Sequence, residues 1–350
     1  MRIRAALTAL MMAGATIAVV TSGTGPAGAS ARAELVVPTI TMVSSSQYSW
    51  AATVGIRGRI SATPAVPAGS EISVTRTGPG PGAEVTLPAL RTGADGSFHW
   101  IEPGLQVAGT AIYRVSYAGN DVFAPAAATK TIEITRTTKS LAVHPYIAYG
   151  SYNATTQFSI QLGGAPQKPG QVIEVYADPF GADQPPALIK RATVPANGQI
   201  FVSLTAVRSV GLTINYLGTE QYAAASRRAW IYTTIPASLT STRQYKTANL
   251  GTVSYAHFRQ TVHPYFTTTM STKPGGRQQL QFEVHSGGQW KKWKNVDASL
   301  NSVGKSYYTL TGAHATGVFY RVRAAYLPGI SLDNLNYNTY TPYRYFTFTK

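Results

Sequence analysis

The segment PAGSEISVTR, residues 67–76, places a Pro-Ala-Gly turn before a run in which Ile72 and Val74 alternate with polar residues. The same pattern returns as PGQVIEVYA at 169–177 and PGGRQQLQFEV at 274–284. The turn glycines Gly69, Gly170 and Gly275 stand 101 and 105 residues apart. Period-two alternation bounded by Gly and Pro is typical of β-strands, so the pattern predicts three successive β units.

Each unit carries a second turn and then a tyrosine-bearing run. The turns end at Gly96, Gly198 and Gly304, and the runs are YRVSYAGN at 113–120, TINYLGTE at 213–220 and YRVRAAYLPG at 320–329. About seven short strands in about 100 residues is the size of an immunoglobulin-like β-sandwich. The sequence therefore predicts an all-β protein of three tandem sandwiches. Four tyrosines are expected to fill the cores with their hydroxyls bonded to backbone: Tyr113, Tyr117, Tyr216 and Tyr320.

Two longer motifs resemble known bacterial modules. YAGNDVFAPAAATKTIEI at 117–134 resembles the last two strands of bacterial Ig-like repeat domains, and GGQWKKWKNVDASLNSVGKSYYTLTG at 287–312 with GVFYRVRAAY at 317–326 resembles Ig-like modules of secreted bacterial repeat proteins. The resemblance covers residues 38–350. Short linkers near 135–138 and 235–237 predict domains at 35–136, 137–235 and 236–350. The third domain departs from it by a Tyr- and Asn-rich insertion at 327–343, and the strand register of 244–258 is left unassigned.

The first 31 residues have the order of a secretory signal peptide. Arg2 and Arg4 precede an apolar stretch at 5–20, and small-residue cleavage sites follow at 27–31. A retained N-terminal anchor is the alternative, but the stretch is short for a membrane span. We expect a secreted, extracellular protein. Any cell-wall association is expected to be non-covalent, because the sequence has no LPxTG-like sorting signal.

Charge and cysteine content narrow the function classes. The chain has no Cys, which excludes disulfides, thiolate metal sites and a Cys nucleophile. Residues 35–135 carry six basic and six acidic side chains, residues 136–235 eight and four, and residues 236–350 thirteen and three. Attraction to an anionic partner is therefore expected at the C-terminal domain.

No constellation of catalytic residues is found in the sequence. The six His residues have no metal-ligand spacing, and Asp178 and Asp183 flank a Pro/Gly loop that is typical of a solvated turn. Gly304-Lys305-Ser306 imitates the end of a phosphate-binding loop but lies between strands. We expect no enzyme activity, no metal and no cofactor.

Binding residues are sought in the third domain. In Trp290-Lys291-Lys292-Trp293-Lys294 aromatic and basic side chains alternate, although strand geometry turns the two Trp residues to opposite faces and favours one of them in the core. Arg321 and Arg323 share one strand face. The insertion adds Tyr337, Tyr340 and Arg344, and Tyr-rich loops suit adaptable binding.

These observations predict a non-catalytic extracellular spacer or adhesion-type binder whose third domain contacts an anionic polysaccharide, cell-wall polymer or glycan. A protein partner is a second possibility, and the chain is expected to be a monomer. The alternative is a carbohydrate-active enzyme or enzyme inhibitor with a site between domains. Nucleic-acid binding has little support, since secretion argues against it and no recognition module is found.

Overall fold

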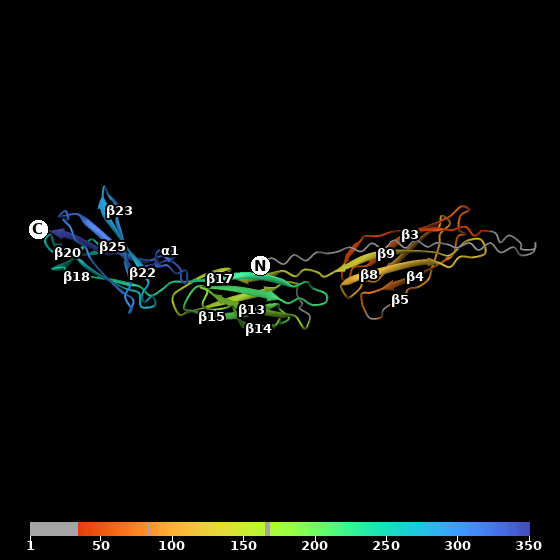
Figure 1. The fold of residues 1–350 in the computed structure, drawn as a ribbon, viewed down its shortest axis with the longest axis horizontal. Helices are drawn as coiled ribbons and strands as arrows, with labels where there is room; N and C mark the ends of the chain where they lie inside the picture. The colour runs from red at the N-terminus through yellow and green to blue at the C-terminus, as the bar shows by residue number, and fades with distance from the viewer. Residues whose placement is uncertain (1–33, 81, 83, 165–168) are drawn as a thin grey trace, which may run out of the picture.

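The computed structural model describes residues 34–350 except positions 81, 83 and 165–168, so the predicted signal peptide at 1–31 lies outside the described residues. Within the described part, all elements are strands except the four-residue helix α1 (Pro328–Ser331). Figure 1 shows the strands gathered into three two-sheet sandwiches that follow one another along an extended molecule. The prediction of an all-β chain of immunoglobulin-like sandwiches is confirmed.

The first unit consists of β1 Thr39–Val43, β2 Gln47–Ser49, β3 Val54–Ser61, β4 Glu71–Thr77, β5 Glu84–Thr86, β6 Leu90–Arg91, β7 Ser97–Glu102, β8 Gly109–Tyr117 and β9 Ala126–Thr135. A three-stranded sheet, β1-β3-β7, faces a larger sheet in the order β2-β9-β8-β4-β5, and β6 pairs with β4. In β4, Ile72 and Val74 are buried while Glu71 and Ser73 are exposed. The alternation predicted for this run therefore gives each sheet one apolar face.

The second unit repeats the arrangement with β10 Leu141–His144, β11 Ile147–Gly150, β12 Ala154–Leu162, β13 Val172–Pro179, β14 Ala187–Thr193, β15 Gln199–Ala206, β16 Val210–Tyr216 and β17 Ala225–Thr233. Its sheets are β10-β12-β15 and β11-β17-β16-β13-β14.

The third unit contains β18 Ser238–Thr242, β19 Lys246–Leu250, β20 Val253–Arg259, β21 Tyr265–Thr269, β22 Arg277–Ser286, β23 Gln289–Ser299, β24 Lys305–Thr309, β25 Phe319–Tyr326, β26 Thr339–Tyr340 and β27 Arg344–Thr349. Its sheets are β18-β21-β24 and β19-β20-β27-β25-β22-β23, with β26 paired to β25. The segment whose register the sequence left unassigned is the β19–β20 hairpin, which turns at Gly251 with φ +62°.

The repeated turn glycines have the same structural role in all three units. Gly69, Gly170 and Gly275 have φ of 76°, 84° and 72°, and β4, β13 and β22 each begin two residues later. Because L side chains rarely adopt this backbone conformation, Gly is the residue that fits there. In every unit an early strand also pairs in parallel with the last one: β2 with β9, β11 with β17, and β20 with β27.

Buried apolar residues form three clusters, one per sandwich. The four tyrosines predicted to fill cores are buried. The predicted hydroxyl partner is wrong for Tyr113, because its hydroxyl donates to the buried carboxylate of Glu102 at 2.5 Å rather than to backbone. That carboxylate also accepts from Arg76 Nε at 3.1 Å, so a polar triad lies inside the first unit.

The insertion of the third unit lies against the second unit. The backbone N–H of Tyr337 donates to Thr233 O at 2.9 Å, and that of Ser209 donates to Leu335 O at 2.8 Å. The buried amide of Asn336 donates to Thr233 O at 3.2 Å and to Val207 O at 3.3 Å. Figure 1 shows α1 at this junction. The segment predicted as a binding loop is thus in large part a joint between two units.

Candidate binding face of the third unit

The outer face of the larger sheet carries polar side chains from two paired strands. In β22 and β25, Leu280, Phe282 and Val322 turn inward and are buried. The intervening residues therefore turn outward, and the register places Glu283 opposite Arg321 and Gln281 opposite Arg323.

Aromatic rings and guanidinium groups alternate on this face. The guanidinium carbon of Arg321 lies 4.6 Å from the centre of the Trp290 ring and 4.0 Å from that of Tyr343. The guanidinium carbon of Arg323 lies 5.0 Å from the Tyr343 ring centre and 4.2 Å from that of Tyr340. Trp290, Arg321, Tyr343, Arg323 and Tyr340 thus form a continuous series, which we call the cation–aromatic ladder.

One carboxylate ties the ladder together at its centre. Glu283 Oε2 accepts from Arg321 Nε at 2.6 Å, and its other oxygen accepts from the Tyr343 hydroxyl at 3.0 Å. Burial, and then this hydrogen bond to Glu283, raise the pKa of Tyr343, and the neutral phenol is the donor in that bond.

The second arginine has no carboxylate partner among the described residues. Arg323 Nε donates to the amide oxygen of Gln281 at 2.9 Å, which leaves its positive charge uncompensated. Rings cover the flat side of a guanidinium, while its N–H donors lie in its plane, so the remaining donors of Arg323 stay available.

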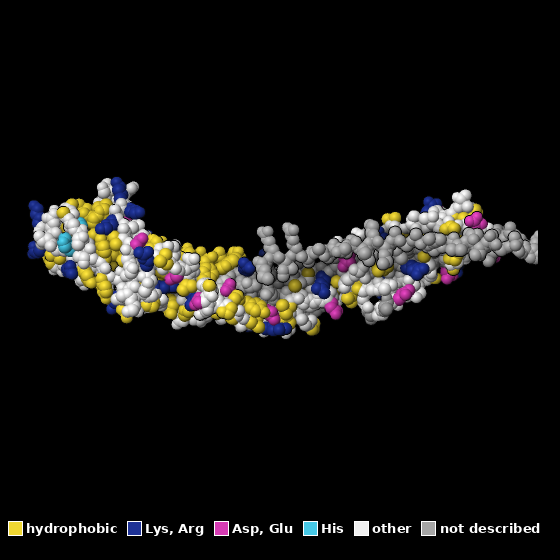
Figure 2. All heavy atoms as spheres, viewed as in Figure 1, with side chains coloured by type: hydrophobic (Ala, Val, Ile, Leu, Met, Phe, Trp, Pro, Cys, Tyr) yellow, Lys and Arg dark blue, Asp and Glu magenta, His cyan; other side chains and the backbone are white. Residues whose placement is uncertain are grey.

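The third unit has more cations than its own carboxylates can pair. In residues 236–350, all of them described, thirteen Lys and Arg face three Asp and Glu. Two of those cations, Arg321 and Lys273, have an ion pair with a described carboxylate. Figure 2 shows Lys and Arg side chains at the protruding end of β23.

The equivalent face of the first unit provides an internal comparison. There the exposed residues of β8 are Thr110, Ile112 and Arg114, and the strand register pairs Arg114 with Thr75 and Thr129, neither of which is aromatic. The second unit has aromatic rings, with Tyr149 stacked 5.7 Å from Tyr232, but no guanidinium of the described residues lies over either ring. Among the described residues, the ladder is therefore a feature of the third unit and not of the shared fold.

The sequence-predicted residues divide into groups. Trp290, Arg321, Arg323 and Tyr340 come together in the ladder, and Lys292 lies beside them, opposite Glu283. Trp293 lies on the other side, against Phe282, Tyr320 and His314, yet remains 38% exposed. A β-bulge in the β22–β23 pairing explains why Trp293 is only partly covered. Lys292 and Lys294 pair with consecutive residues of β22, so Trp293 between them has no partner residue in that strand.

The remaining candidates lie elsewhere. Lys294 Nζ is 5.5 Å from the Tyr308 ring centre, and Lys291 is exposed near the end of the hairpin. Tyr337 packs 5.1 Å from Tyr149 and 5.5 Å from Tyr232, at the joint with the second unit. The structure gives Tyr337 this packing contact, and a part in ligand binding stays a prediction.

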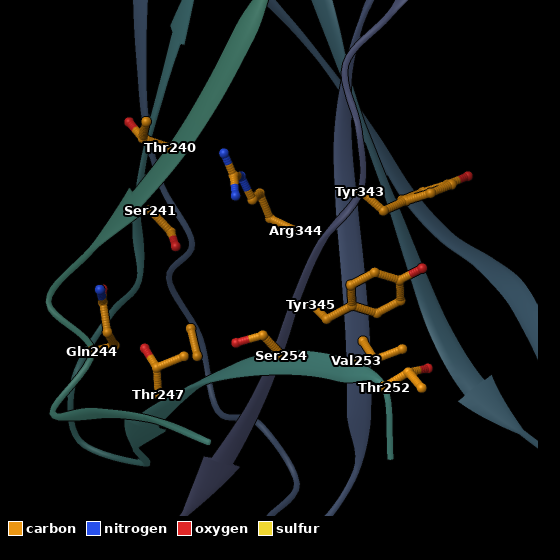
Figure 3. Close-up of a pocket in the computed structure, with 11 residues that line it drawn as sticks. Thr240, Ser241, Gln244, Thr247, Thr252, Val253, Ser254, Tyr343, Arg344 and Tyr345 are labelled. Atoms are coloured by element: carbon orange, nitrogen blue, oxygen red, sulfur yellow. The ribbon is translucent and has the colours of Figure 1, made fainter. Parts of the chain in front are cut away.

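Arg344 lies apart from the ladder, in a groove at the edge of the third unit. The groove has a volume of about 500 Å³. Figure 3 shows Arg344 among Ser and Thr side chains, with Tyr343 and Tyr345 at one side.

Two residues of this face, Glu283 and Gln281, were not predicted as binding residues from the sequence. The period-two patterns of 279–285 and 320–324 do predict that each strand has one outward face. The missing information was the pairing of the two strands, which the sequence does not contain.

Among the described residues, no three His, Asp or Glu side chains gather as metal ligands would. A cavity of about 170 Å³ between the second and third units is lined by Arg208 and Lys273, and these pair with Asp183 at 2.7 Å and Asp333 at 3.3 Å. In the part of the chain that is described, no helix has the length and apolar character needed to cross a membrane.

Comparison with family models gave no match, and comparison with curated proteins gave none. Among solved structures, the chain is similar to native Escherichia coli alpha-2-macroglobulin, with 12% identity, a TM-score of 0.26, and coverage of 89% of this chain and 22% of that one. Salmonella alpha-2-macroglobulin reacted with methylamine is 12% identical with a TM-score of 0.24, and the match covers 89% of this chain and 23% of that one. Dimeric latent PorU from Porphyromonas gingivalis is 10% identical with a TM-score of 0.22, and the match covers 89% of this chain and 34% of that one. The chain thus spans 22–34% of the length of these proteins. Similarity at this level supports no inference about function.

Proposed function

We propose that this protein is a non-catalytic, secreted binding protein whose third unit holds an anionic polymer on its outer sheet face, with the first two units as a spacer. The domain limits 35–136, 137–235 and 236–350 belong to the same proposal. The observation that carries it is the cation–aromatic ladder, because it fixes two guanidinium groups in a row and leaves one of them uncompensated.

Ordering the side chains that bind a partner costs free energy. Arginine side chains lose conformational freedom when they bind, and a guanidinium already held between rings has lost most of it. A polymer with regularly spaced carboxylate or phosphate groups then meets fixed donors of fixed spacing. Guanidinium groups suit both anions, because their parallel N–H donors match two oxygens at once.

The excess of charge supports the same partner. Eleven of the thirteen cations in residues 236–350 have no described ion pair, since thirteen less the two paired ones leaves eleven. The first unit, with six basic and six acidic residues over 35–135, would contribute no such attraction.

The test uses the full secreted chain and two polyanions, polygalacturonate and poly(glycerol phosphate), with neutral dextran as the comparison. The variant R323Q/K292Q removes two charges from the face without breaking a described ion pair. The variant R57Q/R114Q removes two exposed charges from the first unit.

We expect R323Q/K292Q to weaken binding of at least one polyanion at least tenfold, and R57Q/R114Q to weaken it less than twofold. Binding by the unaltered chain should also weaken steeply with salt. Equal loss in the two double variants, or equally tight binding of dextran, would overturn the proposal.

A further inference from the structure

The groove around Arg344 is the open end of the third sandwich. Its walls come from β18 on one sheet and from β19, β20 and β27 on the other. Deeper between the sheets, Leu239, Phe258 and Phe346 are buried. The hydrophobic core therefore ends where the groove begins.

The strand register explains why polar side chains take over at this end. The parallel pairing of β20 with β27 sets Tyr255 level with Tyr345, so Ser254 and Arg344 stand at neighbouring positions and on the same side of the sheet. Both side chains are exposed. Ser241, on the inner side of β18, lies across from them.

The groove lining has one charge and many hydroxyl groups. Arg344 is the cation, no Asp or Glu lines the groove, and two aliphatic residues, Val253 and Ala256, contribute to it. The amide of Gln244 and the rings of Tyr343 and Tyr345 complete the wall. The Ser and Thr residues of the lining are Thr240, Ser241, Thr247, Thr252 and Ser254.

The arginine is held in place but not neutralised. Its Nε donates to the backbone oxygen of Leu239 at 2.8 Å, which fixes the guanidinium against the opposite sheet. Its two terminal nitrogens have no acceptor among the described residues. Figure 3 shows the guanidinium reaching into the space bounded by Thr240 and Ser241.

We infer that this groove binds a single anionic, hydroxylated unit of a polymer, either an acidic sugar or a phosphorylated polyol. The carboxylate or phosphate meets Arg344, and the hydroxyl groups of the unit exchange hydrogen bonds with the Ser and Thr side chains. A neutral sugar would leave the guanidinium without an anion, and an apolar peptide side chain would find little aliphatic surface. The inference rests on the proposed function, since it names the unit of the polymer that this second site recognises.

The position of the groove ties it to the ladder. Tyr343 belongs to the ladder and also lines the groove, so one polymer chain can occupy both. The face then holds the polymer through charge, whereas the groove selects one of its units.

The test uses the full chain and short probes that are too small to span both sites. Trigalacturonate is compared with its fully methyl-esterified form, which has the same body without charge, and a glycerol phosphate trimer supplies the phosphate arm. Binding is measured by calorimetry for the variants R344Q and S254D. The second variant adds a carboxylate beside Arg344 at an exposed strand position, so it tests the groove even if R344Q unfolds. R277Q and S286D are matched changes outside the groove.

We expect at least one charged probe to bind at least tenfold more tightly than the ester, and both groove variants to lose at least tenfold in affinity for it while the controls change less than twofold. The variant R323Q/K292Q should bind the short probe as tightly as the unaltered chain does, but should bind the long polymer more weakly. If no charged probe binds, or if it binds R344Q and S254D as well as the unaltered chain, the groove inference fails while the ladder can still stand. If the long polymers do not bind either, the proposed function fails as well.

Discussion

The guanidinium of Arg321 lies 4.0 Å from the centre of the Tyr343 ring, although Arg321 belongs to β25 and Tyr343 lies in the connection between β26 and β27. Both also bond to Glu283, so each holds the other in place through a shared carboxylate. The ladder is therefore a coupled group and not a set of independent surface side chains, and double-variant cycles should reveal that coupling.

The ring of Tyr343 should stabilise the third unit apart from its hydroxyl group. Y343F keeps the ring and removes the hydrogen bond to Glu283, which should lower the stability of the third unit by about 1 kcal/mol. Y343L also removes the contacts with both arginines and should cost about 1 kcal/mol more. Amide hydrogen exchange in β25 and β27 measures the change in that unit alone. Equal protection in Y343F and Y343L would contradict the role given to the ring, and Y307L on the opposite sheet is the control.

Removing the central carboxylate should separate stability from binding. E283Q takes the ionic partner from Arg321, so we expect lower stability of the third unit by about 1–3 kcal/mol. The same change leaves two uncompensated guanidinium groups on the face, so affinity for polyanions should rise several-fold with a steeper salt dependence. Titration across a salt series measures both effects. Unchanged or weaker binding by a folded E283Q would argue against the face as the contact surface.

The joint between the second and third units depends on Asn336. N336A removes two hydrogen bonds from a buried amide and leaves backbone oxygens without that donor, at a cost of about 1–3 kcal/mol to the closed joint. Small-angle scattering should then report a broader range of overall dimensions. N334A changes an exposed residue of the same type in the same loop and should leave the scattering unaltered. A broadening of equal size in both variants would assign the effect to the loop in general.

Acid should destabilise the third unit through His314. This side chain is buried, and its ring stacks 4.3 Å from that of Phe348. Burial lowers the pKa of His314 below its usual 6.5; a backbone hydrogen bond to Leu310 opposes this, while His263 and Lys294 lower the pKa slightly further. At acid pH the unfolded chain therefore binds a proton at His314 more readily than the folded chain does. The contribution of neutral His314 to the free energy of unfolding is complete above pH 6.5, and it is lost as the pH falls from 6.5 toward the pKa of His314 in the folded chain.

The variant H314F should flatten that dependence without abolishing it, because burial also lowers the pKa of His257. Hydrogen exchange between pH 7.5 and pH 4.5, corrected for the intrinsic exchange rate, measures the slope, with the first unit of the same molecule as reference. A slope in H314F as steep as in the unaltered chain would show that another group controls the acid response.

The buried triad of the first unit should be the most sensitive polar group there. Glu102 accepts from Arg76 and from Tyr113, and both partners are buried. E102Q leaves the buried guanidinium without its counter-charge, for which we expect a loss of about 3–5 kcal/mol. Amide hydrogen exchange in β7 and β8 across a urea series reports on this unit alone, whereas the five Trp residues of the chain are spread over all three units. A loss below about 1 kcal/mol would mean that water reaches the triad.

Local patterns were enough to predict the sandwiches. The turn glycines and the alternation of β4, β13 and β22 are properties of single strands, so they can be read from adjacent residues. The ladder could be predicted in part: Arg321 and Arg323 share a face because of strand geometry alone. Their contacts with Trp290 and Tyr343 depend on which strands become neighbours, and the sequence contains no such pairing. The contacts of the insertion with the second unit could not be predicted, because Asn336 lies 103 positions from its partner Thr233 in the chain.

The parallel pairing of an early strand with the last strand in each unit has a mechanical consequence. A pull on the two ends of a unit acts along these strands, so the hydrogen bonds between them must rupture together and not one after another. The pairing spans three residues in the first unit, four in the second and five in the third. In a molecule bound through its third unit and pulled from the other end, the first unit should thus unfold first. The third unit, which holds the ligand, should unfold last.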